Sequence, residues 1–600
     1  MSLGDTDDEE AVMGYRLSKQ EAQSSFGDDR IFIEKYIEEP RHIEIQIIAD
    51  QHGNVVAFPE RECSIQRRNQ KVIEESPSTL LDTETRKAMG EQACQLARAV
   101  DYVSAGTVEF LCDKHKNFYF LEMNTRLQVE HPITEYVSGV DLVHQMFRVA
   151  AGHPLPQELI DAWNRPEGMP IKGWAIESRV YAEDPLRNFL PSIGRLDRYE
   201  EPQLHHVAPE DKSEEDMIAE SNSDPSGHGF GGVRIDAGVS EGNEISMFYD
   251  PMICKLITHA EDRHQALQKM RDALDAYVIQ GVGHNVEFLR DIMDSQRFID
   301  GHTTTNFIPE EYPDGFQGRK LSPEHRLHMA ATAALMHVIR ESRNYAISGQ
   351  MHNGGVDIES GDQKFGYDGI GGSYGGHQIC VSLSPEPGAA EPNDDEKKTS
   401  SERRTWYAAT VDWDKFGQNA VISVVPPPEE NGSEEQATAQ APYFYFSDID
   451  WGAENPLLRA KIGVIDMGNM SGNDVEPPTT DVSKLLLQHI KRLPEGFALG
   501  YRGALRDCIV RTPRQQELSK FMLHKPGIDY SKVLVSPMPG SLISLAVEEG
   551  QRVEEGQEVA IVEAMKMQNV LRAVKPATVR SIKASPGDTL SVDQVIVEFD

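Results

Sequence analysis

The sequence predicts an α/β region first, then a long helix with a β-rich region, and finally an all-β domain. Three observations support this fold class. Strand-like alternation with one interrupting helix runs from Arg30 to about Glu135. Ser322-Pro323 supplies the residue types that begin an amphipathic helix. After Pro526-Gly527, two similar segments of short strands follow each other. A chain of 600 residues has room for about four domains.

The α/β region contains one clear helix between its strands. Leu81-Asp-Thr-Glu-Thr85 supplies capping residues, and apolar residues follow at helical spacing: Ala88, Met89, Ala93, Leu96, Ala97 and Val100. A second compact region extends to about Pro313 and includes a helical stretch from Arg263 to Tyr277. We therefore expect domains at 1–135, 136–313, 320–525 and 530–600.

Biased segments interrupt two of these domains. Pro209 to Asp224 contains seven acidic residues and one lysine, which predicts a solvated surface insertion at 205–230. Within 320–525, long biased segments separate the short strands and predict disordered excursions: Asn353 to Gly376, Pro385 to Arg404 and Pro426 to Pro442.

The formal net charge of −38 excludes several classes of protein. Phosphate backbones and anionic membrane surfaces repel such a field, so we expect no nucleic-acid partner and no membrane partner. No window approaches the ~18 apolar residues of a membrane span. The six cysteines are scattered without a CxxC pair, which favours a reducing compartment and no structural zinc.

The segments Thr107–Asp113 and Phe118–Asn124 predict a hairpin. If Asp113 faces Phe118, then Glu109 faces Glu122, and two opposed carboxylates repel each other. A divalent cation reverses that repulsion. The oxygen ligands of Glu109, Glu122 and Asn124 suit Mg²⁺ or Mn²⁺ bound to nucleotide phosphates.

Beyond the hairpin, polar residues continue at every second position. Residues spaced by two lie on one face of an extended chain, which predicts one groove lined by Glu122, Asn124, Arg126, Gln128 and Glu130. Spacing alone equally allows the polar, solvated face of a half-exposed strand.

The C-terminal domain contains an internal repeat at an offset of 37 residues. Pro539–Gly550 aligns with Pro576–Gly587, and two like halves of short strands predict a flattened β-barrel or sandwich. Glu563 to Asn569 joins the halves, so Lys566 falls at a turn where its side chain would project. For an isolated Met-Lys-Met, an exposed hairpin with a solvated lysine is the simpler interpretation.

Within this repeat, the run Glu563-Ala-Met-Lys-Met-Gln568 resembles biotinyl carrier domains, with lipoyl domains as the sister family. The resemblance implies covalent biotin on Lys566, attached by a biotin protein ligase.

Four runs resemble the biotin carboxylase version of the ATP-grasp fold: Glu34-Lys-Tyr-Ile37, Arg41-His-Ile-Glu-Ile-Gln46, Arg61-Glu-Cys-Ser-Ile-Gln-Arg-Arg-Asn-Gln-Lys71 and Glu122-Met-Asn-Thr-Arg-Leu-Gln-Val-Glu-His-Pro132. The resemblance covers about Asp5 to Pro313. It implies ATP, bicarbonate and Mg²⁺ or Mn²⁺ as ligands.

The resemblance also implies roles for single residues. ATP contacts fall on Lys35, Tyr36, Ile37, His42, Gln66 and Asn69; bicarbonate contacts fall on Arg126, Gln128 and Val129; metal contacts fall on Glu109, Glu122 and Asn124. Among the catalytic residues, Lys71 would contact phosphate or bicarbonate, Arg126 would hold bicarbonate, and Glu130 would be the general base. Arg179 would stabilise the biotin enolate. Without the resemblance, pairing of Arg179 with Glu183 or Asp184 is an equal alternative.

Four features carry a further resemblance: Tyr312-Pro-Asp-Gly-Phe-Gln-Gly318, the helix that begins at Ser322, Leu518-Ser-Lys-Phe-Met-Leu-His-Lys525 and Glu563-Ala-Met-Lys-Met-Gln-Asn569. They resemble the α subunits of biotin-dependent acyl-CoA carboxylases, most of all those of propionyl-CoA carboxylases. The resemblance implies a helix plus β-barrel domain that docks a carboxyltransferase β subunit, in a hetero-oligomer. In eukaryotes it implies the mitochondrial matrix, and otherwise the cytoplasm. A 3-methylcrotonyl-CoA carboxylase α subunit and a non-catalytic biotinylated partner are the alternatives.

In this family, a Gly-rich loop precedes the matching region and closes over the ATP phosphates, so we expect an incomplete ATP-grasp domain here. Loss of that loop removes both phosphate binding and exclusion of water. We therefore expect the purified chain to accept biotin but to carboxylate it poorly or not at all. Bicarbonate-dependent ATP hydrolysis at rates normal for the family would contradict this expectation.

Overall fold

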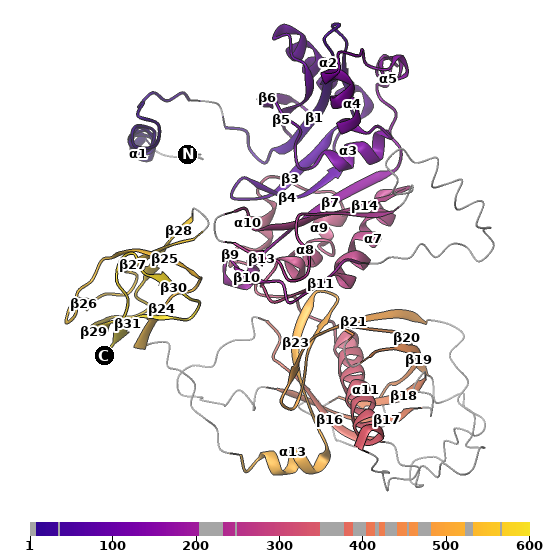
Figure 1. Cartoon of the computed structure of the whole chain (residues 1–600), viewed down its shortest axis with the longest axis vertical. Helices are drawn as coiled ribbons and strands as arrows, with labels where there is room; N and C mark the ends of the chain where they lie inside the picture. The colour runs from indigo at the N-terminus through magenta and orange to yellow at the C-terminus, as the bar shows by residue number, and fades with distance from the viewer. Residues whose placement is uncertain are drawn as a thin grey trace.

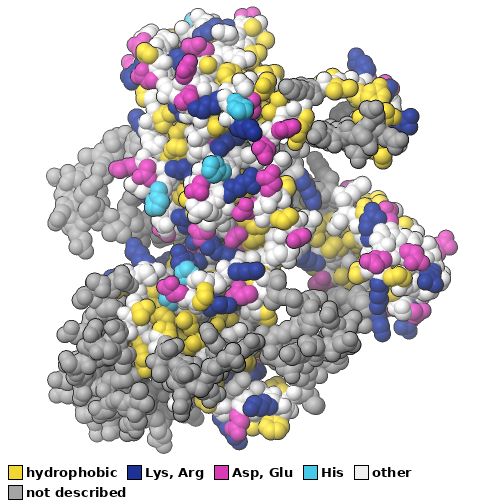
Figure 2. Space-filling view, turned by 180° about the vertical axis from the view of Figure 1, so that it is seen from behind, with side chains coloured by type: hydrophobic (Ala, Val, Ile, Leu, Met, Phe, Trp, Pro, Cys, Tyr) yellow, Lys and Arg dark blue, Asp and Glu magenta, His cyan; other side chains and the backbone are white. Residues whose placement is uncertain are grey.

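The computed structural model describes residues 8–33, 36–202, 232–246, 249–348, 377–387, 404–413, 419–426, 441–452, 455–465, 482–522, 532–564 and 567–600. The insertion predicted at 205–230 and nearly all of the predicted excursions within 320–525 lie outside these residues. Among the helices of this part of the chain, none has the length and hydropathy needed to cross a membrane. Acidic and basic side chains are interspersed over the face shown in Figure 2.

A nine-stranded sheet forms the α/β region (Figure 1). In spatial order its strands are β12 (Val233–Ala237), β14 (Met252–Ala260), β7 (Trp174–Tyr181), β4 (Gln70–Ser76), β3 (Arg61–Arg67), β1 (Arg41–Ala49), β5 (Ser104–Cys112) and β6 (Phe118–Asn124), and β2 (Val55–Ala57) pairs with β1. The sheet therefore contains strands from both of the first two predicted domains, 1–135 and 136–313. Six short strands pair outside this path: β8 (Glu183–Asp184), β9 (Leu190–Pro191), β10 (Gly194–Arg195), β11 (Arg198–Glu200), β13 (Glu244–Ile245) and β15 (Val278–Gln280).

Helices pack against this sheet and enclose its hydrophobic core. They are α2 (Thr83–Ala99), α3 (His131–Ser138), α4 (Leu142–Ala150), α5 (Gln157–Trp163), α7 (Arg263–Ala276), α8 (Val286–Ile292), α9 (Gln296–Ile299) and α10 (Phe307–Glu311), with α1 (Asp8–Phe26) before the first strand. The predicted cap of α2 is confirmed, because the Asp82 carboxylate accepts a hydrogen bond from the Thr85 amide at 2.8 Å. The helix predicted from Arg263 is α7.

The middle region is a closed barrel around a helix. The barrel strands are β16 (His377–Leu383), β17 (Thr405–Trp413), β18 (Ala420–Val425), β19 (Tyr443–Asp450), β20 (Leu457–Ile465), β21 (Ser483–Leu493), β22 (Gly496–Tyr501) and β23 (Ala504–Arg511). Helix α11 (Pro323–Ser348) packs its alanines and methionines against their apolar side chains (Figure 1). The Ser322 hydroxyl accepts from the His325 amide, as predicted for a cap. Helix α13 (Pro513–Ser519) follows the barrel.

The C-terminal domain packs two four-stranded sheets on one core. One sheet contains β24 (Val533–Val535), β31 (Val595–Phe599), β29 (Ala577–Ile582) and β26 (Arg552–Val553); the other contains β28 (Met567–Arg572), β27 (Glu558–Ala564), β25 (Gly540–Leu545) and β30 (Thr589–Leu590). The repeat predicted this arrangement. Strand β29 begins 37 positions after β25 (540 to 577), and β30 begins 37 positions after β26 (552 to 589).

Candidate functional site

Lys71 on β4 lies at the centre of a buried cluster of charges. Its ammonium Nζ is 2.5 Å from a Glu44 oxygen, 3.1 Å from a Glu109 oxygen and 2.6 Å from a Glu130 oxygen. These carboxylates come from β1, β5 and the residue that precedes α3. Strand order places β1 and β5 beside each other, with Glu44 opposite Glu109. The three acids repel one another, so their close approach depends on the lysine between them.

The fully buried Arg61 supports this cluster from β3. It forms an ion pair with Glu44, and its guanidinium also donates to the Gln46 oxygen at 2.9 Å and to the Gln128 oxygen at 2.8 Å. Gln128 in turn donates to Glu109 at 2.6 Å. The arginine therefore ties β1 to the chain segment that contains Glu130.

Arg179 on β7 approaches Glu130 from the other side. Its Nε donates to Glu74 at 2.6 Å and its Nη2 donates to Glu130 at 3.0 Å. Both oxygens of Glu130 are thus occupied, one by Lys71 and one by Arg179. The alternative pairing of Arg179 with Glu183 is wrong, because Glu183 pairs with Arg67 at 2.7 Å. No bond from Arg179 to Asp184 occurs among the described contacts.

The surrounding charges set the protonation of two of these acids. Burial raises the pKa of Glu44, but the charges of Arg61 and Lys71 outweigh it and lower that pKa to about 2. Burial also raises the pKa of Glu109, and the hydrogen bond from His42 with the charge of Lys71 brings it down to about 2. Both carboxylates are therefore ionised at neutral pH.

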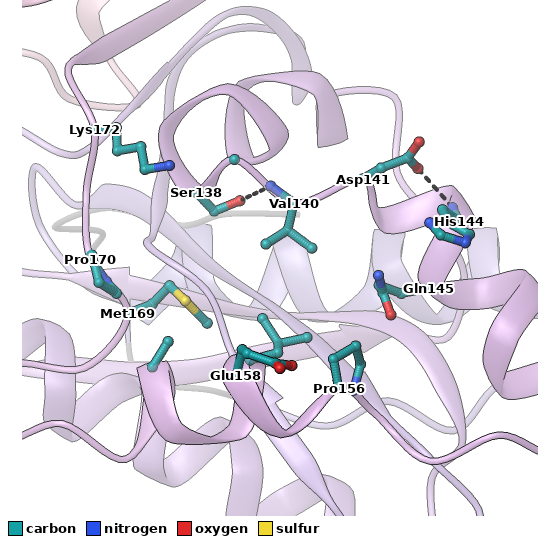
Figure 3. Close-up of a pocket in the computed structure, with 13 residues that line it drawn as sticks. Ser138, Val140, Asp141, His144, Gln145, Pro156, Glu158, Met169, Pro170 and Lys172 are labelled. Atoms are coloured by element: carbon teal, nitrogen blue, oxygen red, sulfur yellow. Dashed lines mark hydrogen bonds between the residues drawn. The ribbon is translucent and has the colours of Figure 1, made fainter. Parts of the chain in front are cut away.

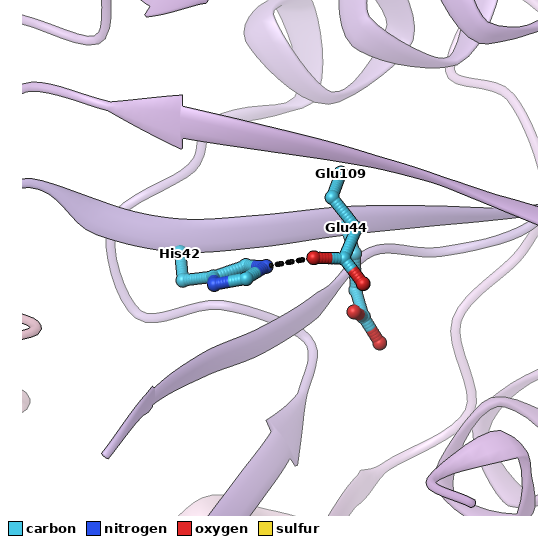
Figure 4. A group of neighbouring side chains, drawn as sticks. All are labelled: His42, Glu44 and Glu109. Carbon is cyan, nitrogen blue, oxygen red and sulfur yellow. Dashed lines mark hydrogen bonds and ion pairs between the residues drawn. The ribbon is translucent and has the colours of Figure 1, made fainter. Parts of the chain in front are cut away.

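The predicted metal ligands lie together at the outer edge of the cluster. Glu109 faces Glu122 across β5 and β6, as predicted. The Asn124 amide lies between them and donates to Glu109 at 2.9 Å and to Glu122 at 3.0 Å. Two carboxylates with a carboxamide are a donor set that fits Mg²⁺ or Mn²⁺. Deeper in the cluster, His42, Glu44 and Glu109 also converge (Figure 4), but Lys71 already supplies the positive charge there.

The predicted register is wrong at the far end of this hairpin. Cys112, not Asp113, faces Phe118. A register shift between Glu109 and Phe110 restores the opposition of the two glutamates. A β-bulge places one extra residue in one strand, so alternation on one strand does not reveal it.

The prediction of one extended face from Glu122 to Glu130 is also wrong. Strand β6 ends at Asn124, and the chain then turns. Gln128 and Glu130 are buried in the cluster, whereas Arg126 is exposed and its guanidinium donates to the Leu127 carbonyl. The backbone carbonyl of Val129 accepts from Lys255 at 2.9 Å. The structure therefore does not bring Arg126 to the other charges.

The predicted ATP contacts fall into two groups. The His42 ring bonds to Glu109 at 2.6 Å (Figure 4). It also bonds to the Gln66 amide at 2.8 Å, and the two bonds together fix its orientation. Asn69 is exposed on the turn between β3 and β4, and Tyr36 and Ile37 lie in the segment before β1. Lys35 lies outside the described residues.

Lys566 also lies outside the described residues. The pairing of β27 with β28 continues as far as Ala564 and Met567. The turn predicted at Lys566 stays a prediction.

A separate cavity of about 410 Å³ lies between the end of α3, the start of α4 and α5 (Figure 3). Its lining includes Gly139, His144, Leu159 and Lys172, and it contains no residue of the predicted site. The charge cluster around Lys71 is therefore the better candidate.

Sequence reasoning missed four buried residues of the cluster: Glu44, Arg61, Glu74 and Glu177. One signal was present, because His42, Glu44 and Gln46 alternate along β1 and share a face. The pairing of β4 with β7, which places Glu74 beside Glu177, joins segments about a hundred residues apart and leaves no local pattern.

Comparisons with known proteins identify the class of protein. Residues 4–158 match the carbamoyl-phosphate synthase L chain, ATP binding domain; residues 225–310 match the biotin carboxylase C-terminal domain; and residues 532–599 match the family described as biotin-requiring enzyme. With the described fold, these matches define a biotin-dependent carboxylase, which is a ligase.

Relatives identify the family. The propionyl-CoA carboxylase alpha chain of Ruegeria pomeroyi is 45% identical over 99% of this chain and 75% of its own length. The mitochondrial human protein of the same name is 41% identical over 99% of this chain and 68% of its own. The chain therefore belongs to the family of propionyl-CoA carboxylase alpha chains. The mitochondrial methylcrotonoyl-CoA carboxylase subunit alpha of Rattus norvegicus is more distant, at 31% identity over 97% of this chain and 68% of its own.

Solved structures match a smaller part of the chain. The biotin carboxylase domain of a thermophilic 2-oxoglutarate carboxylase, bound to bicarbonate, is 41% identical with a TM-score of 0.43. The match covers 51% of this chain and 62% of that domain's chain.

Removal of Lys71 provides a test of the cluster. We expect Lys71→Met to lower the free energy of unfolding of the α/β region by about 3–5 kcal/mol at pH 7, because three buried carboxylates lose their shared cation. Glu44 and Glu109 have lowered pKa values, so the lysine stabilises fully above pH 4.5 and loses its effect as the pH falls toward about 2. Hydrogen exchange of β1, β4 and β5 at several pH values measures this loss.

Lys87→Met is the matched control, because Lys87 donates to the Trp163 carbonyl at 2.8 Å outside the cluster. A difference between wild type and Lys71→Met that stays constant from pH 7 to pH 3 would contradict the electrostatic account.

Proposed function

We propose that this chain uses ATP and bicarbonate to carboxylate biotin on Lys566, and that the carboxyl group then passes to a carboxyltransferase β subunit that converts propionyl-CoA to methylmalonyl-CoA. The observation that carries this proposal is the position of Glu130, held between Lys71 and Arg179 at 2.6 and 3.0 Å. A carboxylate between two cations suits a base that must deprotonate an anion such as bicarbonate.

Glu130 is the proposed general base. It takes the bicarbonate proton, and the resulting oxyanion attacks the γ-phosphorus of ATP. The bond from that phosphorus to the oxygen that bridges it to the β-phosphate breaks, which gives carboxyphosphate and ADP. Lys71 faces the same carboxylate and would neutralise charge on the phosphate or bicarbonate. We assign bicarbonate binding to Arg126, Gln128 and Val129. Since Arg126 lies exposed at the end of β6, this assignment requires its side chain to turn inward when bicarbonate binds.

Metal and nucleotide occupy the outer edge of the cluster in this proposal. Glu109, Glu122 and Asn124 would hold Mg²⁺ or Mn²⁺, which neutralises phosphate charge when bound. The remaining assignments place ATP against Lys35, Tyr36, Ile37, His42, Gln66 and Asn69. A bicarbonate-bound and an ADP- and magnesium-bound biotin carboxylase domain are among the solved relatives, which supports these ligands.

Arg179 is the proposed stabiliser of the biotin enolate. Its guanidinium bonds to the proposed base, so the arginine and the base act on the same small volume. Lys566 would bring biotin there at the tip of the β27–β28 hairpin.

The partners and the compartment are further parts of the proposal. The relatives are alpha chains, which supports a hetero-oligomer with a β subunit docked on the helix plus β-barrel domain. A biotin protein ligase would attach the cofactor. The mammalian relatives are mitochondrial, which supports the mitochondrial matrix if the source is eukaryotic and the cytoplasm otherwise.

Intact mass spectrometry tests the attachment site. Co-expression with a biotin protein ligase should add the mass of one biotin to the wild-type chain and none to Lys566→Arg, since a guanidinium does not form the amide. Lys583→Arg, elsewhere in the same domain, should still gain one biotin. A biotinylated Lys566→Arg chain would place the cofactor on another lysine.

Glu130→Gln tests the base. We expect it to lower bicarbonate-dependent ATP hydrolysis about 10²–10⁴-fold relative to the unmodified chain, because the amide accepts no proton. Binding of Mg-ATP, measured by calorimetry, should persist. Glu158→Gln, an exposed substitution beside the separate cavity, is the control. If the wild-type chain binds no Mg-ATP, the result would favour the alternative of a non-catalytic biotinylated partner.

A further inference from the structure

Two fully buried glutamates lie side by side behind the proposed enolate stabiliser. Glu74 on β4 is the register partner of Glu177 on β7, and both side chains are 0% exposed. Residues paired across a ladder point to the same face of the sheet. Arg179 is two residues beyond Glu177, so it shares that face.

The two carboxyl groups have different partners. One Glu74 oxygen accepts from Arg179 at 2.6 Å. The other Glu74 oxygen and both oxygens of Glu177 have no hydrogen-bond partner among the described residues. An unpaired, ionised carboxylate in such a place is strongly unfavourable.

Apolar packing explains why water does not reach Glu177. The residue opposite it on β14 is Ile257, which belongs to a buried cluster with Ile133, Val137 and Ala175. Helix α3 supplies two members of this cluster and closes over the same face. Glu177 therefore lies between Glu74 and an apolar wall.

The nearby cations already form ion pairs with other acids. Arg179 pairs with Glu74 and Glu130. Lys255 on β14 lies opposite Arg179 and forms an ion pair with Asp236 at 3.0 Å, besides its bond to the Val129 carbonyl. The other titratable groups over this face are His131, Glu135 and Tyr136 on α3, His259 on β14 and Arg234 on β12. The rings of Tyr136 and His259 stack at 5.3 Å. Arg234 lies opposite Ile257, one strand further from Glu177, and forms ion pairs with Glu135 and Asp236 at 3.1 and 2.7 Å.

We propose that Glu74 and Glu177 form a carboxyl pair that carries one negative charge, with the proton on Glu177, and that this pair positions the Arg179 guanidinium against Glu130. Two carboxylates this close in a desolvated site do not both ionise. Both are positioning residues, because they would reach biotin only through Arg179. The role in positioning rests on the proposed function, whereas the shared proton does not.

A single charge on the pair has a consequence for Arg179. If the pair carried two negative charges, it would draw the guanidinium away from Glu130. If the pair carried no charge, the guanidinium would pair with Glu130 alone and neutralise the base. One charge is consistent with a guanidinium that bonds to both Glu74 and Glu130, at 2.6 and 3.0 Å.

Infrared difference spectra of the full chain test the shared proton. At pH 7, Glu177→Gln should remove one protonated-carboxyl C=O band. Glu74→Gln should also remove one band, because Glu177 then becomes the charged partner of Arg179. If Glu74→Gln leaves the band in place, or if Glu177→Gln removes none, the pair does not share a single charge.

The pH dependence of the unfolding midpoint is the second measurement. Burial raises the pKa of Glu177 well above 4.5 and that of Glu74 to about 7. The unfolded chain releases these protons near pH 4.5 while the folded chain retains them, so folding incurs a cost that is absent below pH 4.5 and grows as the pH rises. Glu177→Gln should therefore raise the unfolding midpoint of the α/β region at pH 8 and leave it unchanged at pH 4. A lower midpoint at pH 8 would overturn the proposal.

The rate of biotin carboxylation tests whether Glu74 positions the Arg179 guanidinium. In Glu74→Gln the single charge lies on Glu177, on the strand of Arg179 itself, and draws the guanidinium away from its position between Glu74 and Glu130. Incorporation of labelled bicarbonate into the carried biotin should therefore slow about 10²-fold, since small displacements of a catalytic group have effects of this size. The KM for ATP should stay constant, and Glu74→Asp, which keeps the charge, should restore most of the rate. An equal loss in Glu74→Asp and Glu74→Gln would contradict the positioning role.

Glu287→Gln is the matched control. Glu287 on α8 is also buried, and burial raises its pKa to about 8. Its substitution should remove a carboxyl band and raise the midpoint at pH 8, but it should leave the carboxylation rate unchanged. A wild-type chain without measurable carboxylation would agree with the expectation from family resemblance stated above and would contradict the proposed function, and the infrared and stability results would still decide the shared proton.

Discussion

The interaction between the Lys71 ammonium and three glutamates is the constraint on which the rest of the site depends. Glu44, Glu109 and Glu130 come from separate elements and converge on one cation. Arg61 and Arg179 add two further positive charges, and Glu74 adds one negative charge. Four acids thus face three cations. Glu122, which faces Glu109 across the hairpin, adds a fifth acid, and one divalent cation would balance the two excess negative charges.

Because these buried charges must be held at fixed distances, most of the residues of the cluster lie on strands. Buried ion pairs stabilise only when their geometry is well fixed. Strands β1, β3, β4, β5 and β7 are neighbours in one sheet, so backbone hydrogen bonds fix the spacing of the charged side chains before any ligand arrives. The proposed base is the exception, because Glu130 lies in a turn and depends on Lys71, Arg179 and the start of α3 for its position.

The sequence could predict the parts of this site that have a local pattern. The opposition of Glu109 and Glu122, the cap of α2 and the repeat of the C-terminal domain all follow from spacing within one segment. The bulge beside Glu109 and the end of β6 at Asn124 could not be predicted, because alternation does not record an extra residue or a turn. Likewise, the contacts of Arg61 and Glu74 depend on which strands become neighbours. The barrel around α11 was expected from family resemblance alone, since biased segments separate its strands.

The symmetry of the C-terminal domain relates the hairpin around Lys566 to a second pair of strands. A shift of 37 positions relates β27 to β31, and the reverse shift relates β28 to the segment that contains β24. Strand β24, by which the chain enters the domain, pairs with β31. Strands β24 and β31 therefore take the place in one half of the domain that the β27–β28 hairpin takes in the other. If Lys566 carries biotin as proposed, a rotation of the rigid domain about its entering strand would move the cofactor along an arc that grows with the distance between that strand and the hairpin.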